Sequence, residues 1–196
     1  DDKGFIVVGA RDRYSSGSLN GIVIRTDENA NLIWEKEFLD NSQVSEVIYS
    51  ISQSENGEIF LCSTVNSTIS PSNYQPRVTK IDAAGNVDWQ RTIDSKSRNH
   101  HQFRATTTMN GEVVIVGTSL RELSIGVKGD AFLTKIDSKG NFLWSKAYGS
   151  LDYDDWGWSI IETNMNNLVL IGSTKSFGAS LFDIFLLGAN ADGLTQ

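Results

Sequence analysis

The sequence of 196 residues predicts an all-β fold of small antiparallel sheets that repeat about every 55 residues. Three observations support this. Trp34, Trp89 and Trp144 are each 55 residues apart. Each tryptophan ends a segment that reads D-x-x-G-N-x-x-W, in which Ala30 replaces the glycine of the first copy. Short apolar runs bounded by Gly, Asn and Asp recur in the same register, and no window shows a sustained helical period.

Each unit contains four short segments, and the third unit is the clearest example. Residues 103–107 are small and polar, and residues 113–116 form a continuous apolar run. Residues 131–136 alternate in part between apolar and polar residues, and residues 142–148 carry the tryptophan. Because β-branched and aromatic residues are frequent in them, we expect strands rather than helices. Asn110-Gly111 predicts a tight hairpin with positive φ between the first two strands.

Four antiparallel strands repeated at this period are typical of β-propeller blades, whose sheets pack face to face around a central channel. The polar first segment suits the channel wall, and the apolar second segment suits burial on both faces. We therefore predict a single β-propeller domain or segment over residues 1–196. Its expected parts are a partial blade, two complete blades and a second partial blade, at residues 4–38, 44–93, 99–148 and 154–190.

The number of strands predicts how these blades are completed. Three, four, four and three strands do not divide into four-stranded blades, and a fourth tryptophan turn begins at Asn190 without reaching its tryptophan. Natural sheets avoid exposed edges. We therefore expect either further blades in a longer chain or an oligomer that completes the ring.

The repeated turn residues are predicted to be structural. An indole ring is large enough to reach the next blade, where a backbone carbonyl can accept its N–H. The aspartates and glycines suit a short connection between the third and fourth strands. The residues assigned to this role are Trp34, Trp89, Trp144, Asp27, Asp82, Asp137, Gly85 and Gly140.

Composition excludes several classes of function. The 17 Lys and Arg residues against 24 Asp and Glu give a net charge of −7 without a basic cluster, so a nucleic-acid partner is not expected. No apolar run approaches the roughly 20 residues that cross a bilayer, so no membrane span is expected. Cys62 is the only cysteine, which excludes an internal disulfide and a multi-cysteine zinc site. It aligns with Gly9, Gly117 and Gly172, and we expect a small buried residue there.

The candidate ligand site lies where the inner strands enter one end of the predicted channel. Glu46, His100 and Asp155 occupy equivalent positions in the repeat. With neighbouring aromatic and basic residues they form the predicted channel mouth, which consists of Glu46, Tyr49, His100, Arg104, Asp155 and Trp156.

Two alternatives concern the residues at this end of the fourth unit. Asp152, Asp154 and Asp155 could hold a Ca²⁺ ion, but they lack the ladder of ligands that such a loop uses, and a solvated turn is favoured over a metal site. Trp156 and Trp158 could stack on a sugar, although packing against a neighbouring blade is the favoured interpretation.

The third unit resembles a known bacterial repeat. Gly129–Asp137, Gly140–Trp144 and Asp154-Asp155 before Gly157 are similar to the seven-bladed propeller repeat known as the SBBP repeat, and Pro76-Arg77-Val78 departs from it. The turn is also similar to the tryptophan-docking motif of quinoprotein propellers, with an Asp-to-Trp spacing one residue shorter. The SBBP resemblance implies a bacterial envelope or secreted protein without a shared set of catalytic residues.

The favoured function is a non-catalytic binding or scaffold propeller of the bacterial envelope or exterior, which mediates protein or glycan interaction and needs no cofactor. The alternative is a fragment of a propeller enzyme, a quinoprotein or a glycan-processing enzyme, whose catalytic residues lie in missing blades. The sequence contains no G-x-S-x-G, H-E-x-x-H or G-x-x-x-x-G-K-[ST] motif. The absence of paired catalytic groups favours the first function.

Overall fold

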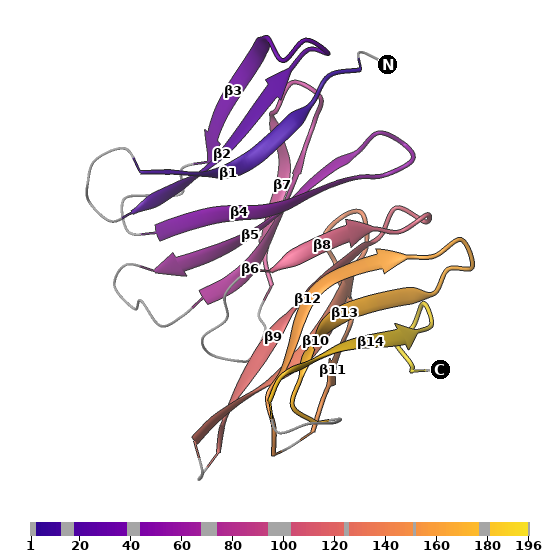
Figure 1. The fold of residues 1–196 in the computed structure, drawn as a ribbon. Helices are drawn as coiled ribbons and strands as arrows, with labels where there is room; N and C mark the ends of the chain where they lie inside the picture. Colours follow the sequence, from indigo (N-terminus) through magenta and orange to yellow (C-terminus); the bar gives the residue numbers. More distant parts are fainter. Residues whose placement is uncertain are drawn as a thin grey trace.

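The computed structural model describes residues 3–12, 18–38, 44–67, 74–93, 103–123, 126–150, 152–176 and 181–195. Within these residues the chain forms fourteen strands and no helix. The strands make four antiparallel sheets of three or four strands, which follow one another in chain order (Figure 1). The predicted all-β fold of repeated antiparallel sheets is therefore confirmed.

Each sheet is built from consecutive strands that pair in sequence order. Sheet 1 contains β1 (Ile6–Asp12), β2 (Leu19–Thr26) and β3 (Leu32–Phe38). Sheet 2 contains β4 (Val44–Gln53), β5 (Ile59–Ser67), β6 (Tyr74–Ile81) and β7 (Val87–Thr92). Sheet 3 contains β8 (Arg104–Thr107), β9 (Val113–Leu123), β10 (Gly126–Ile136) and β11 (Phe142–Tyr148). Sheet 4 contains β12 (Asp155–Glu162), β13 (Leu168–Thr174) and β14 (Asp183–Ala189).

The first strands of sheets 2, 3 and 4 lie side by side, with β8 between β4 and β12 (Figure 1). Hydroxyl groups of β4 bond the backbone of β8. Ser50 Oγ accepts from the Ala105 N–H at 2.9 Å, and Ser52 Oγ accepts from the Thr107 N–H at 2.8 Å. Because β8 is an edge strand, these bonds satisfy N–H groups that its own sheet leaves unpaired. Small hydroxyl residues therefore join the inner edges of neighbouring sheets.

Apolar side chains fill the space between consecutive sheets, and β5 shows how. Phe60 and Cys62 pack in the layer toward sheet 3, whereas Ile59 and Leu61 pack in the layer toward sheet 1. All four are at most 4% exposed. Successive side chains of a strand point to opposite faces, so an unbroken apolar run indicates a strand that is covered on both sides. The predicted burial of the second segment is confirmed for this strand.

Strand pairing corrects the alignment of Cys62 with the glycines. Gly117 pairs with Phe132 and Gly172 with Phe185, and the equivalent pair in sheet 2 is Ser63 with Arg77. Cys62 therefore lies one position earlier than the glycine position. Its side chain is nevertheless buried, as expected, and burial raises the pKa of the thiol to about 12.

The turn between the third and fourth strands has the same hydrogen bonds in sheets 1, 2 and 3. In sheet 2, Asp82 Oδ1 accepts from the N–H groups of Ala84 at 2.9 Å and Asn86 at 2.8 Å, and Asp82 Oδ2 accepts from Asn86 Nδ2. The third residue after the aspartate has positive φ, +78° at Gly85 and +64° at Ala30. Only glycine adopts this conformation without steric cost, which explains the preference for glycine here.

The first residues after β14 form the same turn with an amide in place of the carboxylate. Asn190 Oδ1 accepts from the N–H groups of Asp192 at 3.0 Å and Leu194 at 2.9 Å. An isolated bridge then pairs Ala189 with Thr195, as Ile136 pairs with Phe142 in sheet 3. A neutral amide oxygen is therefore sufficient to organise the turn.

The turn aspartates are expected to make stability sensitive to acid. Hydrogen bonds lower the pKa of all three: the asparagine side chain is the largest cause for Asp27 and Asp137, and the asparagine backbone N–H for Asp82. Because the folded pKa is depressed, this stabilisation is present above the unfolded pKa of about 3.9 and is lost as pH falls through the folded pKa. We expect the urea midpoint of the triple variant Asp27→Asn, Asp82→Asn, Asp137→Asn to fall less than that of the wild type between about pH 5 and about pH 3.

The control for this experiment is Asp88→Asn, which removes an exposed aspartate that takes no part in the turn hydrogen bonds. It should keep the acid sensitivity of the wild type. An equal fall in midpoint for the wild type and the triple variant would contradict the assignment.

The repeated tryptophans connect each sheet to the next. Trp34 Nε1 donates to Ala83 O and Trp89 Nε1 donates to Ser138 O, each at 3.2 Å. Each ring also lies against the turn glycine of the following sheet: a Cβ built on Gly85 would lie 2.9 Å from the Trp34 ring. Trp144 contacts Gly193 in the same way, and the nearby Tyr148 Oη donates to Gly193 O at 2.7 Å. The turn glycines are thus also required by close packing.

Candidate functional site

Glu46 lies on β4 and is buried between sheets 1 and 2. Its side chain is 5% exposed, and Oε2 forms a 3.2 Å ion pair with Nη1 of Arg77 on β6. Glu46 Oε1 accepts from the hydroxyl of Ser63 on β5. Arg77 Nε donates in turn to Thr92 Oγ1 at 3.3 Å. This carboxylate is therefore held inside a buried network.

Asp155, the equivalent residue of β12, has a similar environment between sheets 3 and 4. It is 1% exposed, and its Oδ1 accepts from the hydroxyl of Thr174. Oδ2 accepts from the Ser150 N–H at 3.0 Å and from the hydroxyl of Ser176. Asp155 therefore holds the loop before β12 against the end of β13 through one backbone N–H and two hydroxyl groups, and it is buried rather than part of a solvated turn.

The network of Glu46 replaces an aromatic contact made in sheets 3 and 4. A Cβ built on Gly117 would lie 2.8 Å from the Phe132 ring, and one on Gly172 would lie 2.5 Å from the Phe185 ring. In those sheets a glycine makes room for a phenylalanine of the next strand. Sheet 2 has Ser63 and Arg77 at these positions, so the buried ion pair occupies the space of the ring.

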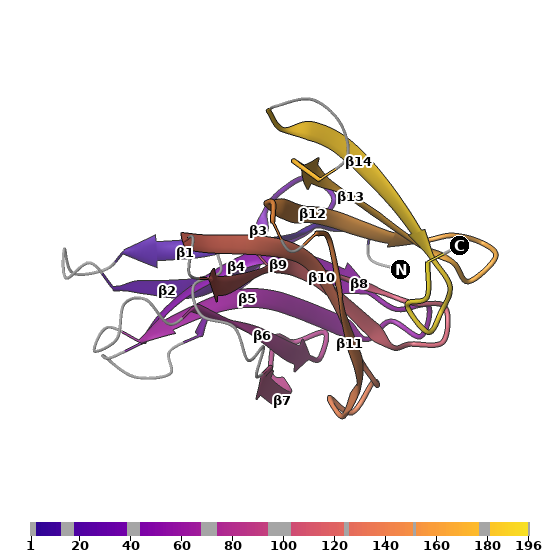
Figure 2. The same ribbon diagram turned by 90° about the horizontal axis from the view of Figure 1, so that it is seen from below.

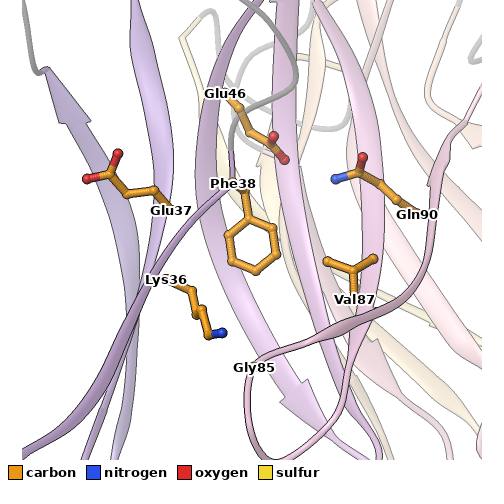
Figure 3. Close-up of a pocket in the computed structure, with 7 residues that line it drawn as sticks. All are labelled: Lys36, Glu37, Phe38, Glu46, Gly85, Val87 and Gln90. Atoms are coloured by element: carbon orange, nitrogen blue, oxygen red, sulfur yellow. The ribbon is translucent and has the colours of Figure 1, made fainter.

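A cavity of about 210 Å³ opens beside this network, between sheets 1 and 2. Glu46 and Gln90 reach toward it from one side, and the Phe38 ring lies between them and Lys36 (Figure 3). Glu37 points away, on the other side of β3. Its Oε1 accepts from Arg11 Nη1 at 3.0 Å. The cavity thus has one carboxylate that is already engaged, and the second carboxylate nearby is directed elsewhere.

Tyr49 and Arg104 of the predicted channel mouth lie beside Trp158 at an accessible edge of the stack. Tyr49 and Trp158 are the bulged residues of β4 and β12, where the pairing skips from Ile48 to Ser50 and from Gly157 to Ser159. Arg104 Nη1 donates to Trp158 O at 3.0 Å and so joins β8 to β12. Burial raises the pKa of Tyr49, and the Arg104 charge opposes this shift. These side chains therefore share one edge of the stack.

Trp156 extends this surface onto sheet 4. Its ring is 5.8 Å from the Trp158 ring and 4.8 Å from the Phe182 ring, measured between centroids. The three side chains belong to residues that are between 37% and 40% exposed. Lys175 Nζ lies 4.2 Å from the centre of the Phe182 ring. We call Tyr49, Arg104, Trp156 and Trp158 the aromatic edge.

The remaining candidates are placed as follows. His100 lies outside the residues that the structure describes. Asp154 Oδ1 accepts from the Gly129 N–H at 3.2 Å, and Oδ2 lies 3.2 Å from Lys175 Nζ. Across the described ranges, no three His, Cys, Asp or Glu side chains come close enough together to hold a metal ion.

Ser63 and Arg77, the two direct partners of Glu46, were not included in the channel-mouth prediction. The signal was present in the second unit, where Pro76-Arg77-Val78 departs from the repeat. Because the partners belong to different strands, only the pairing of β5 with β6 brings Ser63 opposite Arg77.

Comparison of the chain with protein-family models finds no match, and comparison with curated proteins finds no significant similarity. In the part of the chain that the structure describes, no helix has the length and hydropathy needed to cross a membrane.

Proposed function

We propose that this chain is part of a non-catalytic binding or scaffold β-propeller of the bacterial envelope or exterior, and that the aromatic edge contacts a protein or glycan partner. The observation that carries the proposal is the contrast between the predicted site residues. Glu46 and Asp155 are buried and engaged by neighbouring side chains, whereas Trp156 and Trp158 are 37% and 40% exposed.

The propeller architecture is supported by the repeated geometry of the sheets. Consecutive sheets pack face to face, and their first strands lie together on one edge. This arrangement is typical of propeller blades around a channel. The likeness of the third unit to the SBBP repeat is the basis for proposing a bacterial envelope or exterior location.

The chemistry of the aromatic edge favours contact over catalysis. General acid–base catalysis needs a titratable group within reach of a substrate, and both predicted carboxylates are enclosed by protein. Exposed indole rings beside a guanidinium offer large apolar faces with polar edges, which are frequent in interfaces.

The experiment measures binding of the purified chain to an array of bacterial glycans and to envelope proteins of stated identity. Trp158→Ala and Arg104→Ala should each reduce binding of a captured partner at least tenfold. The matched control is Met165→Ala, which truncates a side chain of an 81% exposed residue in a turn and should leave binding unchanged. Hydrolysis of a glycan or reduction of a quinone by the wild type would overturn the non-catalytic assignment.

A further inference from the structure

Sheet 4 carries an apolar face that is built like the interfaces inside the stack. On this face Ile171 of β13 pairs with Leu186 of β14. The residues are 42% and 70% exposed, and Ile184 of the same face is 80% exposed. Figure 2 shows β14 at the border of the molecule, and none of the described strands lies beyond it. We call Ile171, Ile184 and Leu186 the sheet 4 patch.

The equivalent side chains of the preceding sheets are covered by the sheet that follows. Val116 pairs with Leu133 in sheet 3, as Ile171 pairs with Leu186 in sheet 4, and both members are 0% exposed. Cys62 pairs with Val78 in sheet 2, with exposures of 1% and 0%. The positions equivalent to the sheet 4 patch are therefore buried in both sheet 2 and sheet 3.

Sheet 1 has an exposed apolar face of the kind that contacts the preceding sheet elsewhere in the chain. Val7 is 53% exposed, and Phe5, which bonds to Thr26 just before β1, is 57% exposed. By strand pairing Val7 is equivalent to Leu61, Ile115 and Leu170, which contact the preceding sheet and are 0–1% exposed. The equivalent faces of sheets 2, 3 and 4 are covered by the sheet that precedes each of them, whereas this face of sheet 1 is exposed.

We propose that sheet 4 of one copy docks on the open face of sheet 1 of a second copy, head to tail. The argument is continuity: each of the three interfaces within the chain joins a face like that of sheet 4 to a face like that of sheet 1. Burial of these Val, Leu, Ile and Phe side chains removes apolar surface from water and so stabilises the interface. Because the two faces differ, the contact is heterologous and continues until it closes into a ring or forms a filament.

This docking leaves Tyr49, Arg104 and Trp158 accessible, whereas Trp156, which pairs with Ser173 and through it with Ile184, lies on the docking face. Tyr49 is the bulged residue of β4, as Trp158 is of β12, and it stays partly exposed although sheet 3 covers sheet 2. The binding test of the proposed function uses Trp158 and Arg104, which lie outside the docking face, so self-association and ligand binding can fail separately.

The test uses sedimentation velocity of the 196-residue chain over a range of concentrations. The wild type should form species larger than a monomer, whose proportion increases with concentration. Val7→Asp and Leu186→Asp should each give monomers, because each variant lacks one of the two faces. Mixed in equal amounts they should form a 1:1 dimer and nothing larger, since only the sheet 4 patch of Val7→Asp and the sheet 1 face of Leu186→Asp remain intact.

Two results would overturn the proposal: a wild type that is monomeric at every concentration, or a mixture of the two variants that stays monomeric while each variant alone is folded. Circular dichroism and thermal melting report folding, and substitutions at positions this exposed should leave both unchanged. Met165→Asp, in an exposed turn outside both faces, is the matched control and should assemble like the wild type.

Discussion

Replacing Trp89 with alanine is expected to lower the free energy of unfolding by about 3 kcal/mol. The indole connects two sheets: its ring lies 6.1 Å from the Phe60 ring and against Gly140, and Nε1 bonds Ser138 O. Truncation removes the packing of an aromatic side chain between sheets 2 and 3 and leaves a void, because the glycine turn has no side chain to fill it. Urea unfolding at neutral pH measures the loss.

Two further variants separate the contributions of this residue. Trp89→Phe keeps part of the packing but loses the N–H donor, and we expect a smaller loss than for alanine. Trp156→Ala is the matched control, because it removes a tryptophan that is more exposed and not docked on a turn; loss of its ring contacts with Trp158 and Phe182 should cost about 1 kcal/mol, less than Trp89→Ala. Equal losses for Trp89→Ala and Trp156→Ala would contradict the connecting role of Trp89.

Arg77→Met is expected to lower the free energy of unfolding by at least about 3 kcal/mol. The change leaves the Glu46 carboxylate buried without its 3.2 Å guanidinium partner. Coulombic attraction and hydrogen bonding compensate the desolvation of a buried pair, and removal of one member leaves that desolvation uncompensated. Thermal unfolding followed by calorimetry or circular dichroism measures the effect.

A triple variant tests whether the whole network can be replaced. Glu46→Val, Ser63→Gly and Arg77→Phe together install the glycine and phenylalanine pair of sheets 3 and 4. Exchange of a buried ion pair for well-packed apolar residues is often neutral or stabilising, so this variant should regain the stability lost in Arg77→Met. A triple variant that is less stable than Arg77→Met would show that sheet 2 cannot adopt the packing of its neighbours.

The sequence predicted the repeat, the four sheets and the docking of Trp34 and Trp89 because a single turn geometry recurs. The constraint is local: Asp82 and Asn86 are four residues apart and bond each other directly. Such a short-range pattern can be recognised from the sequence alone. The predicted positive φ at Gly111 was confirmed for the same reason, with an observed value of +75°.

The environment of the predicted site residues could not be predicted in the same way. Glu46 and Asp155 each precede a bulge in their strand. A bulge inserts one residue and changes which face the following side chains take. The alternation of side chains along the strand therefore does not show on which face of the sheet Glu46 lies relative to Tyr49. Only the three-dimensional pairing shows that Glu46 is enclosed and that Tyr49 lies at the edge.

The main contacts between sheets join neighbours in the stack, and this has a consequence for how the molecule opens. In such an array the free energy of folding is approximately a sum of terms for single units and for nearest-neighbour interfaces. Sheets 2 and 3 take part in two interfaces each, whereas sheets 1 and 4 take part in one within a single copy. Cooperative unfolding therefore begins at both ends of the array, and the backbone amides of β5, β6, β9 and β10 exchange with solvent last.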